Sequence, residues 1–389
     1  MNVLVINAGS SSLKYQLLDP DTREVFAKGN CERIGINDAF IGHEELGGEK
    51  QILKVDLPNH KVAIQHVFDI LKPLGKEISG IGHRVVQGGW YISSSVVVDD
   101  EVMAHIREVA PLAPLHNPAE ADVIDICREM FPSIPNVVAC DTAFHYDMPE
   151  KAWRYALPRP VCNKLHIRKY GMHGTSHRFI WRATNAFTKG ASHKVVSCHL
   201  GSGASLCAIQ DGKSLDTTMG LTPLDGLIMG TRTGTLDPAC VFYLVREGGY
   251  SIDEIDNMMN KESGLRALSE VSSDSRDIED AAHKGDAHSQ MALEMFYYRT
   301  SSLVASMAQS MHGFDTLVFS AGIGENSSEM RAGVAAELEW LGVKIDPAKN
   351  ELRSGEIRDI SAEDSRVRVL VVPTNEELMI ALDVQDLIK

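Results

Sequence analysis

The sequence predicts an α/β protein made of two related halves, and three observations support this prediction. The chain opens with an apolar run at 3–6, a Gly/Ser turn and a second apolar run at 13–18, a pattern typical of a β-hairpin. The same order of strand, Gly-Ser turn and strand returns in residues 194–210. Short apolar strands alternate with helical periodicity elsewhere. We therefore expect two α/β halves, each opening with a hairpin that faces a shared cleft; chance likeness of two hairpins is the alternative.

Individual elements follow from the same patterns. Gly9-Ser10 aligns with Gly201-Ser202, with a slip of one residue after the turn. Residues 373–375 carry start signals for a final helix, and a cluster of prolines suggests a hinge near residues 145–160. Helices are expected over residues 64–71, 292–311 and 376–388, and short strands over 137–140, 317–320 and 367–372.

The composition excludes several classes of function. A chain of 389 residues, 44% of them apolar, can form two or three domains with sizeable cores. Its net charge of −15 argues against nucleic acid or an anionic membrane as the main partner, so an anionic substrate would need a local basic pocket. Seven scattered cysteines without a CxxC pair indicate reduced thiols, and the lack of a signal peptide or a long apolar run favours a cytoplasmic protein.

The opening turn offers several hydrogen-bond donors to one anion. Backbone N–H groups, the hydroxyls of Ser10 and Ser12 and the ammonium of Lys14 follow the first strand directly. Gly/Ser turns between strands can cradle a phosphate in this way, although an ordinary hairpin turn has the same pattern. The chain has no GxxxxGK[ST], which excludes a P-loop enzyme, and it lacks the protein-kinase motifs.

Two charged residues are candidates for a ligand site. Asp141 follows the strand at 137–140, where open α/β sheets place ligands; its carboxylate could hold Mg²⁺ or orient an attacking oxygen. A helix N-cap is the structural alternative for Asp141. Arg84 lies between glycines in residues 82–89, and its planar fork matches a carboxylate or a phosphate. A surface salt bridge is the alternative for this arginine.

Further candidates lie in glycine-containing turns. His173 precedes a helix whose first N–H groups favour an anion, whereas His177 is expected to be a satisfied structural histidine. Arg232 lies in a Gly/Thr turn whose donors suit phosphoryl oxygens, with a plain loop as the alternative. No third His or Cys has zinc-site spacing. Asp274 could cap a helix or reach a ribose or base, and residues 322–326 lack the third glycine of a dinucleotide fingerprint.

Together these motifs resemble those of the acetate kinase family, within the superfamily of acetate and sugar kinases, Hsp70 and actin. The resemblance runs from Val3 to about Ala381. Nine motifs agree in order and spacing, which makes coincidence implausible. They are NAGSSSLK at 7–14, GHRVVQGG at 82–89, DTAFH at 141–145, GMHGTSH at 171–177, HLGSG at 199–203, GTRTGTLDP at 230–238, SSDSRD at 272–277, GIGEN at 322–326 and PTNEEL at 373–378.

The resemblance implies a duplicated RNase H-like fold of the actin-like ATPase type, with ATP bound in an interdomain cleft. It implies an N-terminal domain at 1–150, completed by a last helix at 376–389, and a C-terminal nucleotide-binding domain at 151–375. The implied reaction is reversible, Mg²⁺-dependent phosphoryl transfer between ATP and acetate, giving acetyl phosphate and ADP, and Mn²⁺ could replace Mg²⁺. A cytoplasmic homodimer acting on these small molecules is expected, with no nucleic acid or membrane partner.

On the acceptor side, the resemblance implies metal ligands and a substrate pocket. Asn7 and Glu376 would be metal ligands, direct or through water. Arg84 would hold the acetate carboxylate, and Asp141 would lie beside the acceptor and the metal. Acetate is already ionised at pH 7, with a reference pKa of about 4, so it needs no general base. This argues that Asp141 is a metal-binding or orienting residue and not a proton acceptor. The methyl pocket would be bordered by Val86, Leu115, Met172 and Pro223.

On the phosphate side, the resemblance implies a transfer site and a nucleotide site. His173 and Arg232 would stabilise the phosphoryl group in transfer. Ser10, Ser12 and Lys14 would line the phosphate path, and Lys14 would also contact the nucleotide. The other nucleotide-binding residues would be His199, Leu200, Gly201, Ser202, Gly203, Asp274, Ser275, Arg276, Gly322, Ile323, Gly324, Glu325 and Asn326.

Two positions depart from the common family pattern. Ser202 stands where Asn is frequent, which could change one hydrogen bond to the nucleotide. Met172 stands where Phe or Ala is frequent, and a flexible Met could admit a slightly longer acid, whereas Val86 favours acetate. A propionate or butyrate kinase of the same family is the nearest alternative. A non-transferring ATPase of the actin or Hsp70 type is the alternative from another class.

Overall fold

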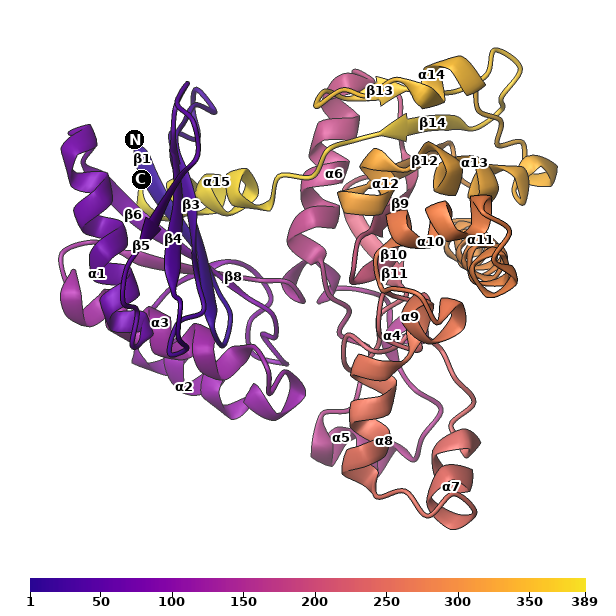
Figure 1. Cartoon of the computed structure of the whole chain (residues 1–389), viewed down its shortest axis with the longest axis horizontal. Coiled ribbons are helices and arrows are strands. Elements are labelled where there is room, and N and C mark those ends of the chain that lie inside the picture. The colour runs from indigo at the N-terminus through magenta and orange to yellow at the C-terminus, as the bar shows by residue number, and fades with distance from the viewer. The chain divides into compact units, whose positions relative to one another are not determined.

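The computed structural model describes residues 1–389 and divides the chain into two compact units. Unit 1 comprises Met1–Tyr146 and Asn375–Lys389, and unit 2 comprises Asp147–Thr374. Each unit contains a mixed sheet with helices packed on it, so the predicted α/β class is confirmed (Figure 1). None of the helices combines the length and the apolar character that crossing a membrane requires.

The sheet of unit 1 has eight strands in the order β5-β4-β3-β2-β1-β6-β8-β7. β1 pairs in parallel with β6, and β6 with β8, while the other neighbours are antiparallel. The apolar run at the start of β1 is buried because this strand lies in the middle of the sheet. The strands are β1 (Asn2–Ala8), β2 (Ser12–Leu18), β3 (Val25–Glu32), β4 (Phe40–Glu45), β5 (Gln51–Lys54), β6 (Ile78–Val85), β7 (Val96–Val97) and β8 (Asn136–Cys140).

Four α-helices cover this sheet: α1 (His60–Leu71), α2 (Asp100–Glu108), α3 (Asn117–Met130) and α15 (Glu376–Ile388). Asn59 caps α1 and Asp99 caps α2, each accepting a backbone N–H in the first turn. Apolar residues of α1 and α3, including Val67 and Val123, form one core with Leu4 of β1 and Ile81 of β6.

The C-terminal helix α15 packs on the face of β6 opposite this core. Successive residues of a strand point to opposite faces, so Ile81 points into the core while Gly80 and Gly82 point to α15. A Cβ on Gly82 would lie 2.5 Å from Cγ2 of Ile380, and a Cβ on Gly80 would lie 2.6 Å from Cγ1 of Val384. The two glycines therefore let the helix approach the strand closely, and Figure 1 shows yellow α15 among the purple elements of unit 1.

The sheet of unit 2 has six strands in the order β11-β10-β9-β12-β14-β13. β12 is parallel to both β9 and β14, and the other neighbours are antiparallel. The strands are β9 (Lys194–Leu200), β10 (Ala204–Gln210), β11 (Lys213–Thr217), β12 (Thr316–Ser320), β13 (Arg358–Asp359) and β14 (Arg368–Val371).

The helices of unit 2 include the longest of the chain, α11, whose Phe296 is buried. They are α4 (Glu150–Trp153), α5 (Arg159–Leu165), α6 (Gly174–Phe187), α7 (Ala239–Arg246), α8 (Ile252–Asn257), α9 (Gly264–Ser269), α10 (Ser275–His283), α11 (Ala287–Ser310), α12 (Ala321–Asn326), α13 (Ser328–Ala336) and α14 (Pro347–Glu351).

The predicted duplication is confirmed by the two sheets. The order β3-β2-β1-β6-β8-β7 of unit 1 matches β11-β10-β9-β12-β14-β13 of unit 2, with the same parallel and antiparallel pairings. The predicted one-residue slip is also present, because Ala8 pairs with Leu13 in the first hairpin and Leu200 with Ala204 in the second. Unit 1 extends the shared arrangement by β4 and β5.

The helices and strands expected from sequence patterns are confirmed, and most of their observed ends lie within one or two residues of the expected ends. The expected helices correspond to α1, α11 and α15, and the expected strands to β8, β12 and β14. Asn375 caps α15 by accepting the N–H of Leu378, as its start signal predicts. Helix α12, directly after β12, was not expected from the sequence.

We expect Gly82→Ala to destabilise the protein by about 1–3 kcal/mol, because the new methyl group would overlap Ile380 and push α15 from the sheet. Thermal unfolding monitored by circular dichroism would measure the change. Gly355→Ala is the control, since a Cβ on this exposed glycine meets no atom within 4 Å. An equal melting temperature for Gly82→Ala and wild type would contradict the packing argument.

Candidate active site

Arg84 and Asp141 form a bidentate ion pair at one end of the unit 1 sheet. Nε of Arg84 donates to Oδ1 of Asp141 at 3.1 Å, and Nη2 donates to Oδ2 at 2.6 Å. The parallel pairing of β6 with β8 places Arg84 opposite Ala139 and so brings both side chains to the same edge. The Asp141 side chain is 1% exposed and that of Arg84 is 20% exposed. Asp141 is therefore not a helix N-cap, and Arg84 is not in a surface salt bridge.

Two more carboxylates lie beside this pair. Oε2 of Glu376, the first residue of α15, is 3.8 Å from Nε of Arg84. Burial raises the pKa of Glu376 to about 7, with a further contribution from the charge of Asp141. Burial also raises the pKa of Glu120, on α3, to about 8. Asp141 and Glu376 thus bring two carboxyl groups to one guanidinium group, an excess of acid that a second cation would relieve.

The opening hairpin brings Asn7 and Lys14 to the same region. Ile6 lies opposite His83 in the parallel pair of β1 and β6, so Asn7 continues toward the sheet edge that carries Arg84. Asn7 and Lys14 face each other across the hairpin, and the charge of Lys14 lowers the pKa of Glu376. Ser10 is exposed in the turn, and Ser12 is partly exposed at the start of β2.

The side chains at this edge suit a hard divalent cation. The amide oxygen of Asn7 and the carboxylate of Glu376 are oxygen donors of the kind that Mg²⁺ prefers. No group of three or more His, Cys, Asp or Glu side chains is arranged to hold a metal ion. Mg²⁺ keeps several of its waters and needs only one or two protein carboxylates, so the residues present fit this ion.

The four residues expected to border a methyl pocket belong to different units. In unit 1, Val86 is buried and Leu115 is 60% exposed. In unit 2, Met172 is buried and Pro223 is partly exposed. The carbonyl oxygen of Pro223 accepts a hydrogen bond from Nη1 of Arg232 at 3.3 Å, so within unit 2 this pocket residue contacts a predicted catalytic residue.

Three histidines of unit 2 gather around the second hairpin. Oγ of Ser205 lies 2.9 Å from Nδ1 of His173 and 2.8 Å from Nε2 of His177. The ring of His173 stacks on His199, with centroids 4.2 Å apart. His177 is fully buried and also bonds Oγ of Ser197 at 2.9 Å, which confirms it as a satisfied structural histidine. Sequence patterns did not indicate Ser205, which pairs opposite His199 as Lys14 pairs opposite Asn7.

Arg232 is a cation without an acidic partner. Burial lowers its pKa, and no carboxylate contributes to its electrostatic environment. Its Nη1 lies 3.4 Å, and Nε2 of His173 lies 3.5 Å, from the position that a Cβ on Gly203 would occupy. The two side chains therefore converge on the turn of the second hairpin. An anion at this turn would meet the guanidinium of Arg232, which no protein carboxylate already occupies.

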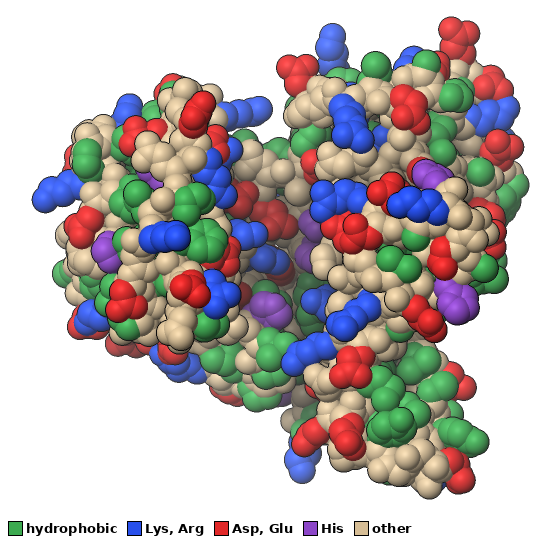
Figure 2. Space-filling model, viewed as in Figure 1, with side chains coloured by type: hydrophobic (Ala, Val, Ile, Leu, Met, Phe, Trp, Pro, Cys, Tyr) green, Lys and Arg blue, Asp and Glu red, His purple; other side chains and the backbone are tan.

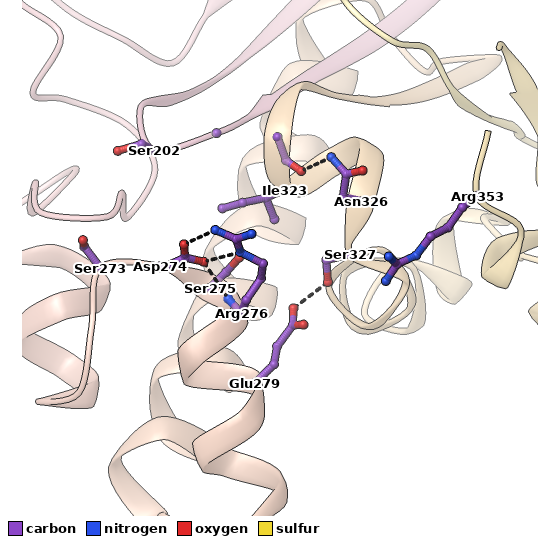
Figure 3. Close-up of a pocket in the computed structure, with 12 residues that line it drawn as sticks. Ser202, Ser273, Asp274, Ser275, Arg276, Glu279, Ile323, Asn326, Ser327 and Arg353 are labelled. Carbon is purple, nitrogen blue, oxygen red and sulfur yellow. Dashed lines mark hydrogen bonds and ion pairs between the residues drawn. The ribbon is translucent and has the colours of Figure 1, made fainter. Parts of the chain in front are cut away.

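A pocket of about 590 Å³ adjoins the same turn in unit 2 (Figure 3). It lies between the hairpin turn, the start of α10, helix α12 and the segment after α14. Eight residues that the resemblance implies for nucleotide binding line it. They are Gly201, Ser202, Asp274, Ser275, Arg276, Gly322, Ile323 and Asn326.

The rim of the pocket is organised by side-chain bonds. Asp274 caps α10 by accepting the N–H of Arg276, and its carboxylate pairs with the Arg276 guanidinium at 2.6 Å. Oγ of Ser327 donates to Oε1 of Glu279 at 2.5 Å (Figure 3). Sequence patterns missed three lining residues, Glu279, Ser327 and Arg353, whereas a fourth, Ser273, lies in the motif at 272–277 without an assigned role. Glu279 follows Ser275 by one helical turn, so helical spacing could have indicated it, whereas no local signal indicates Arg353.

The other residues expected at the nucleotide do not line this pocket. Leu200 is fully buried, and Gly324 packs against the backbone of Phe319. Oε1 of Glu325 accepts the N–H groups of Ala321 and Thr374, at 2.8 and 3.0 Å. Two further residues, His199 and Gly203, lie at the His173 and Arg232 cluster, and Lys14 belongs to unit 1.

The duplicated sheets, the pocket beside a Gly/Ser turn and the unpaired cation facing that turn define the class of protein, a kinase with the actin-like ATPase fold. The chain belongs to the acetokinase family, whose sequence profile matches residues 2–382. It is therefore a phosphotransferase with a carboxyl group as acceptor.

Relatives of known sequence and structure match the whole chain. It is 47% identical to the acetate kinase of Acetivibrio thermocellus and 49% identical to that of Desulfitobacterium hafniense, each over 100% of both chains. The crystal structure of Porphyromonas gingivalis acetate kinase superposes with a TM-score of 0.94 at 40% identity, over 100% of both chains. A propionate kinase from Francisella tularensis superposes with a TM-score of 0.94 at 39% identity, over 99% of both chains.

We expect the buried carboxyl of Glu120 to make the protein less stable as pH rises. Its folded pKa of about 8 exceeds its ordinary value of 4.5, so the folded state keeps a proton that the unfolded state releases. Stability linked to this proton is complete below pH 4.5 and is lost as pH rises to about 8. Each tenfold difference in proton affinity contributes about 1.4 kcal/mol, so the loss can reach a few kcal/mol.

Glu120→Gln removes this titration, and melting temperatures of both proteins at about pH 5 and about pH 9 test it. We expect the variant to gain stability over wild type at the higher pH, with little gain at the lower pH. Comparison at each pH cancels the other titrating groups. A difference between variant and wild type that is independent of pH would contradict the prediction.

Proposed function

We propose that this protein transfers the γ-phosphoryl group of ATP reversibly to acetate, giving acetyl phosphate and ADP, with Mg²⁺ required. One observation carries the proposal beyond membership of the family: Arg232 and His173 converge, without an acidic partner for Arg232, on the turn that also lines the pocket. A carboxylate and a polyphosphate repel each other, so transfer between them needs cations at both. In unit 2, Arg232 offers such a cation to the phosphoryl group, and Arg84 offers one to the acceptor.

Arg84 binds the acetate carboxylate in this proposal, and Asp141 orients Arg84. Asp141 already holds Nε and Nη2 of the guanidinium, which leaves Nη1 for a substrate oxygen. Acetate is ionised at neutral pH and attacks as it is, so no residue needs to remove a proton. Arg84 and Asp141 therefore need only to hold the nucleophile in line with the phosphorus atom.

Arg232 and His173 stabilise the phosphoryl group during transfer. A loose transition state spreads negative charge over three equatorial oxygens, and fixed donors lower its energy. The bond from Ser205 to Nδ1 of His173, together with the stacking on His199, fixes the imidazole so that Nε2 points toward Gly203. The pocket lined by Ser202, Asp274 and Asn326 holds the nucleoside part of ATP.

Asn7 and Glu376 are the residues that would hold Mg²⁺. The bound ion would neutralise charge on the phosphate oxygens. Lys14 extends the positive charge of this region, and Ser10 and Ser12 add hydroxyl donors along the phosphate path. The acid excess around Arg84 supports a cation at this edge of the unit 1 sheet.

The direct test is to incubate the protein with ATP, Mg²⁺ and acetate, and to trap acetyl phosphate with hydroxylamine. Hydroxamate that depends on all three components would support the proposal. Folded protein that forms no hydroxamate would overturn it, and ATP hydrolysis without hydroxamate would indicate a non-transferring ATPase instead.

Arg232→Ala should lower kcat by roughly 10²–10³, as expected for loss of a donor that acts on the transition state. The same trapping assay at saturating ATP and acetate measures kcat. Arg299→Ala is the matched control, because Arg299 lies exposed on α11, away from the proposed site. A near-normal kcat for Arg232→Ala would remove this role.

The second candidate function is a kinase for propionate or butyrate, favoured by the similarity to a propionate kinase at 39% identity. We expect acetate to be preferred over propionate by about 10–200-fold in kcat/KM, since one methylene is worth about 1–3 kcal/mol in an apolar pocket. Buried Val86 and Met172 would border that pocket. Side-by-side kinetics with acetate, propionate and butyrate measure the order, and a higher kcat/KM for propionate or butyrate would favour the second candidate.

We also propose that the protein works as a cytoplasmic homodimer. All seven cysteines are free thiols, as is usual in a reducing compartment. Figure 2 shows hydrophobic side chains gathered over α7 and α8, where Phe242, Tyr243 and Ile252 are 58%, 69% and 62% exposed. Such a group suits burial against a second copy, and light scattering of the purified protein measures the oligomeric state.

A further inference from the structure

The segment after β6, which follows Arg84 and contains Val86, is held by a row of buried side chains. Three successive backbone N–H groups each donate to a side chain from another element. We call these three side chains the loop clasp. Val86 donates to Oε2 of Glu120 at 3.0 Å, Gln87 to Oδ1 of Asn117 at 3.1 Å, and Gly88 to Oγ1 of Thr142 at 3.1 Å.

The loop clasp is rigid because its members are buried and cross-linked. Asn117, Glu120 and Thr142 are at most 2% exposed. Nδ2 of Asn117 donates back to the carbonyl of Gln87 at 2.8 Å. Gly89, at φ 59°, approaches Val109 so closely that a Cβ would lie 2.4 Å from its Cγ1. The backbone at 86–89 is therefore fixed from both sides.

The same contacts join the two strand ends that carry the acceptor site. The N–H of Asp141 donates to the carbonyl of Val85 at 2.9 Å, and Thr142 is the next residue. Loss of a clasp bond would release the backbone of Val86, which directly follows the end of β6 and lies two residues after Arg84. The clasp thus sets where the Val86 side chain lies relative to Arg84 and Asp141.

Glu120, which accepts the N–H of Val86, is an unexpected residue type at this buried position. An amide or a hydroxyl could accept the Val86 N–H, as in the two neighbouring contacts, without placing a third carboxyl beside Asp141 and Glu376. Burial of a carboxyl group is unfavourable unless its hydrogen bonds are made. Glu120 also lies in the first turn of α3, where the helix dipole favours an acid.

We propose that Glu120 is a positioning residue that, through the N–H of Val86, fixes the Val86 side chain and so sets the size of the acid that the enzyme accepts. This inference rests on the proposed function and adds a specificity determinant to it. Glu120 does not touch the substrate; it acts through the backbone of the loop.

The test compares Glu120→Met with Glu120→Gln. Met fills a similar volume but lacks the acceptor oxygen, whereas Gln keeps an acceptor oxygen and cannot ionise. We expect Glu120→Met to raise the KM for acetate by about tenfold and to narrow the preference for acetate over propionate several-fold. The KM for ATP should stay within about twofold, since the nucleotide pocket lies in unit 2. Glu120→Gln should retain wild-type values.

Glu129→Met is the matched control, on the same helix but with a side chain 68% exposed. If Glu120→Met does not fold, Thr142→Val removes the neighbouring clasp bond with little change in volume and should shift the same two parameters. Folded variants with unchanged acetate KM and unchanged acid preference would overturn the inference. Equal impairment of Glu120→Gln and Glu120→Met would also overturn it, because it would show that the acceptor oxygen is not what matters. Wild-type protein inactive on every acid would instead disprove the proposed function.

Discussion

The ion pair between Arg84 and Asp141 is the contact on which the charged end of the unit 1 sheet depends. It ties the ends of two parallel strands, and it holds a guanidinium group in one orientation. Glu120 and Glu376 add two carboxyls around that group, and burial shifts the pKa of both toward or beyond neutrality. An acid-rich edge of this kind suits a metal ion and a bound anion together, because each offsets charge that the other brings.

Unit 2 repeats the sheet topology of unit 1, but the charge beside its hairpin is positive rather than acidic. Its second hairpin takes the place of the first, but His199 and Ser205 stand where Asn7 and Lys14 stand in unit 1. Arg232 lies nearby without an acidic partner, and polar side chains such as Ser202 and Asp274 help to line the adjoining pocket. Duplication of one topology has therefore produced one unit rich in carboxyls beside a fixed arginine and another whose arginine has no acidic partner. Divergence of a few side chains at equivalent strand ends accounts for this difference in charge between the two units.

Much of the fold and part of the candidate site could be predicted from local patterns. Strand ends marked by Asp141 and by the two Gly/Ser turns were identified because parallel strands bring such residues to one edge. The capping role of Asp274 followed from its position before an amphipathic helix. Glu120 and Ser205 could not be found in this way, since their partners are distant in the chain, and no local periodicity marks Arg353. Leu200 and Glu325 belong to the right motifs, yet one is core and the other bonds the backbone of its own unit.

The sequence by itself determined the α/β class, the internal duplication, the family and the identity of the polar groups that can bind an anion. These properties depend on residue periodicity and on short motifs, which are local along the chain. Only the tertiary structure decided which of those groups are already occupied: Arg84 is held by Asp141, whereas Arg232 is not held by any acid. It also decided that buried Glu120 supports Val86. The physical reason is that charge pairing and burial depend on distances between residues far apart in sequence, and only packing of the sheets sets those distances.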